Sequence, residues 1–273
     1  MSNVLEESLY KKQVKCYEKI ADITRGFSGT YCRRTILGAT IFDIAENYAR
    51  KKEFSLEILR YPFKDEELWA FTFVKKGTIF LCVNTELPMC KQVFAVAHEL
   101  YHIHCYVENK DFNAIRNGSI LESKVVDDAA MTQEDLEANA FAGLLLMPDD
   151  LLSEQVSLYG ISSRKITVDD VLLLMQLFVL PYKAVVLRLG EGKLITEDKV
   201  NELLRCDTGY ISKRIELTGR AKQWQMSGEG IDYFGSLLDN LEFNSKNEFL
   251  TESREEADRR FLKELRASFR EKE

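Results

Sequence analysis

His98-Glu99-Leu100-Tyr101-His102 lies inside a stretch, residues 92–107, whose apolar residues recur at helical spacing. Positions i and i+4 of a helix lie on one face, so His98 and His102 can direct imidazole nitrogens to the same ion. Glu99 then lies beside an open coordination position. The stretch therefore predicts a helix that carries a metal site. Its apolar stripe consists of Val93, Val96, Ala97, Leu100 and Ile103.

Zinc suits this donor set, because a catalytic zinc takes three protein ligands and one water. The metal lowers the pKa of that water from about 16 towards about 7. Glu99 is the expected proton acceptor, which later passes the proton to the leaving amine. A chance H-E-x-x-H occurs in roughly one chain in a hundred of this length, so the motif needs support from other residues. His104, the remaining histidine, should face away from the metal.

A second predicted helix, which begins at Thr132 and ends before Pro148, is expected to supply the third ligand. Glu137 shares the apolar stripe of Phe141 and Leu144, and a carboxylate buried there needs a cation. Glu137 is therefore the expected ligand, although a helix-dipole or salt-bridge role would also explain it. Glu134, on the same face one turn earlier, is the alternative ligand.

Local patterns predict the remaining elements of an α+β fold with a small antiparallel sheet. Residues 57–61, 69–74 and 78–83 are rich in β-forming residues, and Lys75-Lys76-Gly77 indicates a hairpin. Helices are predicted over residues 5–31, with a break at Gly26 and Gly29, and over residues 41–52. The polar stretch 108–128 has no firm periodicity and is predicted to be a loop or a flap.

The chain is expected to contain three parts: residues 1–160, the catalytic domain with its N-terminal helices; residues 161–205, a small helical subdomain resembling a helix-turn-helix; and residues 206–273, a charged helical extension. Seventeen of the 32 residues 242–273 are charged. Apolar residues nevertheless recur there every four positions, which predicts a mostly exposed amphipathic helix that docks on its own domain or on a partner protein. These residues are Ala257, Phe261, Leu265 and Phe269.

Composition narrows the class of protein. The 273 residues are 45% hydrophobic and 30% charged, which is typical of a folded soluble protein. A net charge of −7 argues against a broad nucleic-acid surface. The apolar run 171–180 is about half the length of a membrane span, and the acidic N-terminus lacks the pattern of a secretory signal. The expected location is the cytoplasm, with the six cysteines reduced.

Three segments together resemble the ImmA/IrrE metallopeptidases. The first is the strand Phe80-Leu81-Cys82-Val83-Asn84, and the second is the H-E-L-Y-H helix preceded by Phe94-Ala95-Val96-Ala97. The third is the helix Glu137-Ala138-Asn139-Ala140-Phe141-Ala142, which ends in Leu145-Leu146-Met147-Pro148. The later pair Arg188-Leu189 is also similar. The resemblance covers roughly residues 41–204.

The resemblance implies a gluzincin-like (zincin-like) fold, a zinc ion bound by His98, His102 and Glu137, and Glu99 as the base. It also implies a protein substrate, namely a repressor or antitoxin of helix-turn-helix type. Tyr101 departs from the family, in which glycine is common at this position, and residues after Cys206 have no counterpart. The alternative function is a non-proteolytic regulator, or a component of a toxin–antitoxin or phage-defence pair, that acts by binding a partner or DNA. An intact Glu99 favours the enzyme, because a structural zinc site is usually closed by a fourth ligand.

Overall fold

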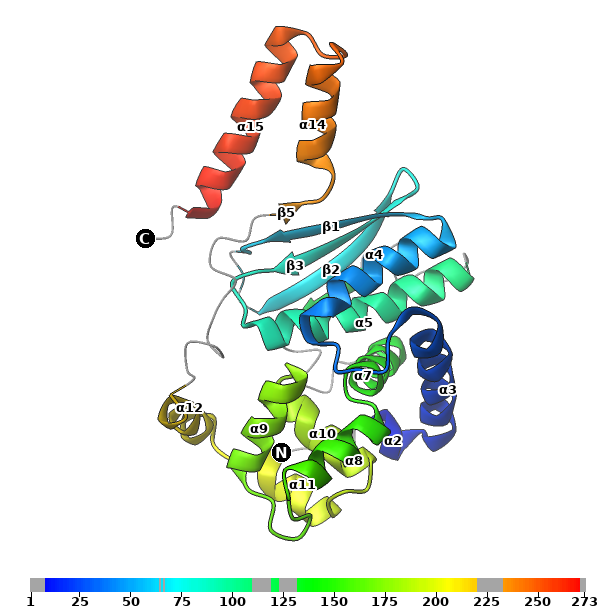
Figure 1. The fold of residues 1–273 in the computed structure, drawn as a ribbon, viewed down its shortest axis with the longest axis vertical. Coiled ribbons are helices and arrows are strands. Elements are labelled where there is room, and N and C mark those ends of the chain that lie inside the picture. The colour runs from blue at the N-terminus through cyan, green and yellow to red at the C-terminus, as the bar shows by residue number, and fades with distance from the viewer. Residues whose placement is uncertain are drawn as a thin grey trace.

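The protein combines a central sheet, helices packed against it and a projecting helical hairpin (Figure 1). The computed structural model describes residues 8–63, 65, 67–109, 119–122, 132–219 and 233–270. Its first helices are α2 (Leu9–Lys12), α3 (Val14–Tyr31), the 3-10 helix η1 (Gly38–Thr40), α4 (Ile41–Lys52) and α5 (Met89–Glu108). The later helices are α7 (Gln133–Leu146), α8 (Asp149–Leu158), α9 (Val168–Phe178), α10 (Tyr182–Glu191), α11 (Glu197–Leu204), α12 (Thr208–Leu217), α14 (Leu237–Lys246) and α15 (Glu252–Arg270).

The sheet has the strand order β4-β2-β3-β1-β5. The predicted hairpin is confirmed: β2 and β3 are antiparallel, and Lys76 and Gly77 between them both have positive φ, as a two-residue hairpin turn requires. The small sheet predicted as antiparallel is in fact mixed, because β1 lies parallel to β3 instead of pairing with its sequence neighbour β2. The strands are β1 (Ser55–Tyr61), β2 (Leu68–Lys75), β3 (Thr78–Asn84), β4 (Ser119–Glu122) and β5 (Tyr233–Phe234).

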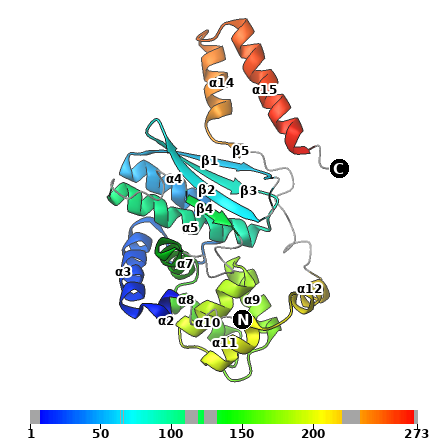
Figure 2. The ribbon, with the colours of Figure 1, turned by 180° about the vertical axis from the view of Figure 1, so that it is seen from behind.

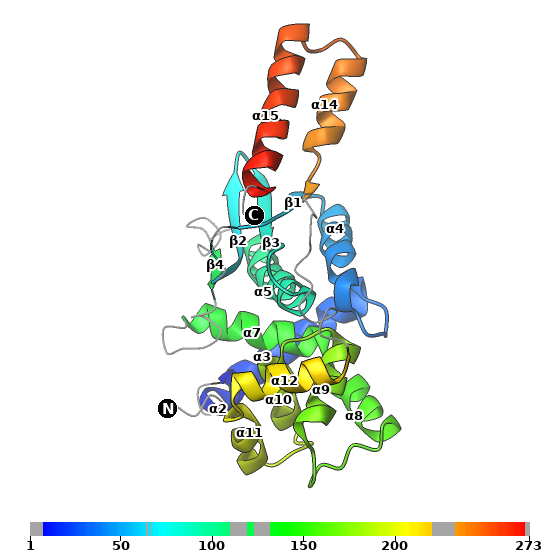
Figure 3. The same ribbon diagram turned by 90° about the vertical axis from the view of Figure 1, so that its left-hand side faces the viewer.

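One face of the sheet is covered by the motif helix. Helix α5 packs against β2 and β3, and α4 packs against β1, as Figures 1 and 3 show. The alternating residues Ile79, Leu81 and Val83 of β3 are buried in the core beneath these helices. Strand β4, at the opposite edge from β5 (Figure 2), falls within the predicted loop 108–128, most of which lies outside the described residues.

The N-terminal helix differs from its prediction. Helix α3 continues through Gly26 and Gly29 to Tyr31, and the interruption lies at Gln13, between α2 and α3. A glycine inside a helix costs only about 1 kcal/mol relative to alanine. The buried side of α3, which includes Ile20 and Phe27, offsets that cost by packing against α7 and α4.

Helices α8 to α12 form a group below α7 (Figure 1), and Arg188 of α10 ties this group to the rest of the protein. Arg188 is only 2% exposed, although it is charged. Its guanidinium donates to the backbone carbonyl of Met147 at 3.1 and 3.2 Å, to Tyr17 Oη at 2.9 Å and to Glu191 Oε2 at 2.8 Å. A buried charge is tolerated when it is paired in this way. Arg188 of the Arg188-Leu189 pair therefore has a structural role in packing α10 against the rest of the protein.

Gly143 of α7 leaves space for the side chain of Arg188, because a Cβ at position 143 would lie 2.9 Å from Arg188 Cδ. We expect Gly143→Ala to lower the free energy of unfolding by about 1–3 kcal/mol through overpacking. Gly26→Ala in α3 is the matched control, because its Cβ would meet nothing within 4 Å. That substitution should raise stability by about 0.5–1 kcal/mol. Urea denaturation measures both changes, and equal effects at the two sites would contradict the packing role of Gly143.

The C-terminal helices form a hairpin that projects from the β1 edge of the sheet (Figure 3). Phe234 of β5 is buried, and Ser236 donates from its backbone N to Glu57 Oε2 at 2.7 Å. The helix over residues 252–270 agrees with the predicted amphipathic element. The predicted apolar stripe differs at Phe261, which is 59% exposed, whereas the neighbouring Leu262 is buried. The side chain of Phe269 lies outside the described residues.

Among the described residues, no single helix has the length and apolarity to cross a membrane. Helices α9 and α10 meet these criteria of length and composition only when they are taken together, and the chain bends by 100° between them.

Candidate metal centre

The motif residues lie on the buried side of α5. His98 and Glu99 are 0% exposed and His102 is 1% exposed. The helix begins after Pro88, which suits a helix start because it has no amide hydrogen to leave unbonded. The prediction that His98 and His102 share one face is confirmed, because their Nε2 atoms lie 3.2 Å apart.

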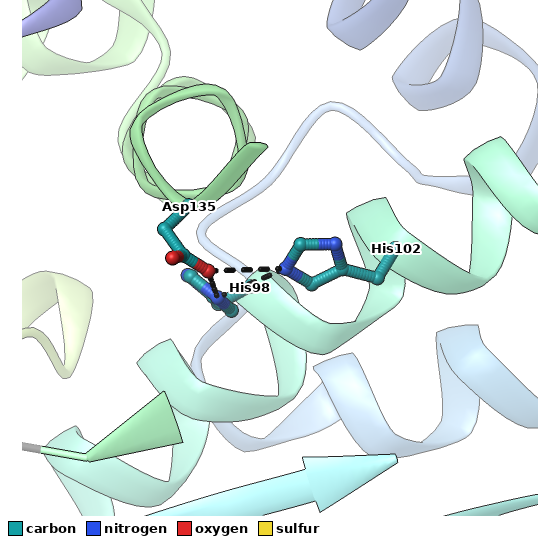
Figure 4. Close-up of side chains that lie close together, drawn as sticks. All are labelled: His98, His102 and Asp135. Carbon is teal, nitrogen blue, oxygen red and sulfur yellow. Dashed lines mark hydrogen bonds and ion pairs between the residues drawn. The ribbon is translucent and has the colours of Figure 1, made fainter. Parts of the chain in front are cut away.

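A carboxylate from α7 completes a group of three possible ligands (Figure 4). Asp135 Oδ1 lies 3.9 Å from His98 Nε2 and 3.8 Å from His102 Nε2. The three ligand atoms all lie within 4.8 Å of one another. It is the one group of this kind in the part of the chain that the structure describes. Helices α5 and α7 therefore bring together a possible His-His-Asp metal site.

The N-cap of α7 orients this carboxylate. Asp135 Oδ2 accepts from the backbone N of Thr132 at 3.1 Å and from its hydroxyl at 2.6 Å. In return, Thr132 Oγ1 accepts from the backbone N of Asp135 at 3.1 Å, which makes a capping box. With Oδ2 held by the cap, Oδ1 is left to face the two imidazoles. Asp135 thus caps the start of α7 while it contributes to the metal group.

Asn139, one turn after Asp135, contacts the other nitrogen of His98. Its Oδ1 lies 2.9 Å from His98 Nδ1. If the amide oxygen accepts, Nδ1 carries the hydrogen and the Nε2 lone pair is left for a metal. Such a partner on the far ring nitrogen is the usual support for a histidine ligand.

The electrostatic environment keeps both imidazoles neutral. Burial lowers the pKa of His98 to about 4, against smaller opposing effects of Asn139 and Asp135. Burial, and next the charge of His98, lower the pKa of His102 well below its usual value. A neutral imidazole is the form that binds a metal, so little proton release is needed for binding at neutral pH.

Glu137, the ligand expected from the sequence, lies elsewhere. Its Oε2 accepts from Tyr101 Oη at 2.6 Å, and its Oε1 accepts from Gln133 Nε2 at 3.0 Å and from Cys16 Sγ at 3.2 Å. Burial acts to raise the pKa of Glu137, but these hydrogen bonds outweigh it and lower the pKa. Glu137 therefore joins α3, α5 and α7, and it is Asp135 that lies with the histidines.

Glu134, the alternative ligand, is also outside the group. Burial raises its pKa, and the neighbouring charges of Asp135 and Glu137 raise it further. His104 points away from the metal group, as expected: its Nδ1 lies 2.9 Å from Tyr48 Oη, and its ring packs edge-on against Phe27.

A family model described as Peptidase_M78, IrrE N-terminal-like domain, matches residues 51–190. The match covers just over half of the chain and includes both helices of the metal group. The chain belongs to the M78 peptidase family. The M78 region contains β1 to β4, α5 and α7 to α9, and it reaches Gly190 in α10. Most of α2 to α4 precedes it, and α11 to α15 follow it.

A solved structure described as a Mycobacterium tuberculosis transcriptional regulator is similar at 19% identity, with a TM-score of 0.41. The similarity covers 68% of this M78 chain and 51% of that protein, so the chain spans about half of that protein's length. A comparison with curated proteins finds no match.

Proposed function

We propose that the protein is a zinc-dependent endopeptidase, with His98, His102 and Asp135 as zinc ligands and Glu99 as the proton acceptor. The observation that carries the proposal is the convergence of two imidazoles and one carboxylate from two helices. Membership of a peptidase family supports the same activity. Asp135 replaces Glu137 in the proposed ligand set, because Glu137 is bound to Tyr101 and Gln133.

The donor set fits zinc. Ligand atoms that each lie about 2.0–2.2 Å from a tetrahedral zinc are roughly 3.3–3.6 Å apart. The separations of 3.2, 3.8 and 3.9 Å lie around that range. Three protein ligands leave one position for water, as in other catalytic zinc sites. Bound zinc supplies Lewis acidity and lowers the pKa of that water.

The chain's own residues then have distinct tasks. Glu99 accepts a proton from the attacking water on its carboxylate and donates it to the leaving amine. Its complete burial in α5 keeps bulk water from competing for that proton. Thr132 and Asn139 hold Asp135 and His98 in place through the contacts described above. None of these positioning contacts requires the substrate.

For the substrate, we propose a regulatory protein of helix-turn-helix type, either a repressor or an antitoxin. The proposal is supported by the resemblance of the three sequence segments to the ImmA/IrrE peptidases. Purified protein should cleave such a regulator encoded beside its own gene, and N-terminal sequencing of the fragments would give the cleaved bond. Cleavage that persists in the presence of a zinc chelator would contradict the proposal.

We expect the purified protein to contain about one zinc ion per chain. A chelator should remove it, and added zinc should restore it. Elemental analysis after dialysis measures this content. His104→Ala is the matched control, because His104 contacts Tyr48 and should not affect zinc content. Protein that never contains zinc, even after refolding with the ion, would contradict the metal site.

We also propose that the hairpin α14–α15 is separate from the catalytic part. A chain that ends at Ser236 keeps β5 and the contact with Glu57. We expect it to fold and to retain full zinc content, because no residue of the metal group lies beyond Asp135. Circular dichroism and elemental analysis provide the test. Loss of folding or of zinc would show that the hairpin belongs to the catalytic domain.

A further inference from the structure

An apolar cavity lies beside the metal group, where α7 faces α10 and the start of α2. Its volume is about 80 Å³. Mostly apolar side chains line it, and Ala184 and Leu187 of α10 are only half-buried there, so the cavity can be reached from outside. The main apolar lining residues are Leu9, Phe94, Leu136, Ala140, Ala184 and Leu187.

The cavity and the metal group share structural elements. Phe94 lies one turn before His98 on α5, and Leu136 directly follows Asp135 on α7. Asn139 is common to both, since it lines the cavity and contacts His98 Nδ1 at 2.9 Å. Through Asn139, the wall of the cavity is therefore in contact with one of the histidines of the metal group.

The cavity favours an aliphatic occupant, because most of its lining surface is apolar. Arg188 and Glu191 also line it, but they bond to each other at 2.8 Å, and Arg188 also donates to Met147 O. Burial of an aliphatic group against the apolar walls is favourable. The other polar residues of the lining are Ser8, Asn139 and Lys183. The volume is about half that of a 150 Å³ cavity that accepts benzene, so a branched aliphatic side chain fits better than an indole.

We propose that this cavity binds an aliphatic side chain of the substrate, of about the size of leucine, next to the bond that is cleaved. The inference rests on the proposed peptidase function. Consecutive residues of an extended chain are about 3.3–3.6 Å apart. For a peptide whose reacting carbonyl lies at the metal group, the proposal places a neighbouring side chain in this cavity, because Asn139 both lines the cavity and contacts His98.

Two amino-acid hydroxamates test the proposal on the full-length, zinc-loaded protein. Leucine hydroxamate and glycine hydroxamate have the same metal-binding group and differ only in the side chain. Isothermal titration calorimetry should show that leucine hydroxamate binds at least about tenfold more tightly. Ala184→Phe should fill the cavity and remove this difference, and Leu187→Ala should reduce it by removing one wall. Ala257→Phe, an exposed position on α15, is the matched control and should preserve the difference.

The outcomes separate the two proposals. Equal affinities of the two hydroxamates for the unaltered protein would overturn the side-chain site while leaving the metal site intact. A tenfold difference that survives in both Ala184→Phe and Leu187→Ala would also overturn it. If neither hydroxamate binds to protein that contains zinc, the open coordination position is wrong, and both proposals fall together.

Discussion

Glu99→Gln is expected to abolish proteolysis while zinc remains bound. The substitution removes the proton acceptor but keeps the size of the side chain and both histidine ligands, so the rate of cleavage should fall by about 10²–10⁴-fold. Elemental analysis should still find about one zinc per chain. The rate is measured with the regulatory protein proposed as the substrate.

Glu134→Gln is the matched control for this experiment. It makes the same change of a carboxylate to an amide, on a half-buried residue of α7 outside the metal group. Its cleavage rate should stay close to that of the unaltered protein. Full activity in Glu99→Gln would exclude Glu99 as the base, and loss of zinc from it would show that Glu99 binds the metal.

Asp135→Ala is expected to weaken zinc binding by more than about 100-fold. Loss of a residue that merely supports a ligand already costs 10–100-fold in affinity, so loss of a ligand itself should cost more. Asp135 is the proposed ligand because its Oδ1 lies 3.8 and 3.9 Å from the two imidazole Nε2 atoms. Competition with a fluorescent zinc chelator measures the change.

Asp135 also belongs to a capping box, so its replacement removes a cap as well as a ligand. Asp170→Ala controls for the cap, because Thr167 and Asp170 form the same capping box at the start of α9, away from the metal group. Glu137→Ala controls for loss of a nearby carboxylate. Both variants should keep zinc. If Glu137→Ala loses zinc and Asp135→Ala does not, the ligand expected from the sequence is the correct one.

The sequence predicted those features that depend on local spacing. The i, i+4 histidines, the hairpin at Lys76-Gly77 and the cap at Thr132 each occur where the local pattern indicated. Each depends on residues only a few positions apart, and for this reason a single sequence was sufficient.

Asp135, the third ligand proposed here, could not be found in the same way. Nearly every residue of α7 from Ala138 to Leu146 is buried, so the helix has no single apolar face from which to infer the side that meets α5. The stripe through Phe141 and Leu144 therefore selected Glu137. One available signal was the spacing of Thr132 and Asp135, because a capping box fixes the direction of the carboxylate.

The pairing of strands that are distant in the chain was likewise not predictable from the sequence. Nothing near residues 55–61 indicates that β1 lies parallel to β3. The register shift in β2 between Leu68 and Ala70 is another example. Trp69, at this shift, packs edge-on against Phe94 of α5. A bulge of this kind arises from contacts between strands, so the sequence of one strand alone does not reveal it.

The position of β5 has a consequence for how the chain folds. Leu59 pairs with Phe234, so the last strand joins a sheet edge that was made near the start of the chain. Closing such a long loop is entropically costly, and contacts of large sequence separation form slowly. During synthesis, β1 to β3 leave the ribosome well before β5 does, and domains fold as they emerge. Until β5 arrives, β1 is an open edge that can pair with another chain, and β5 then covers this edge at Leu59 and Arg60.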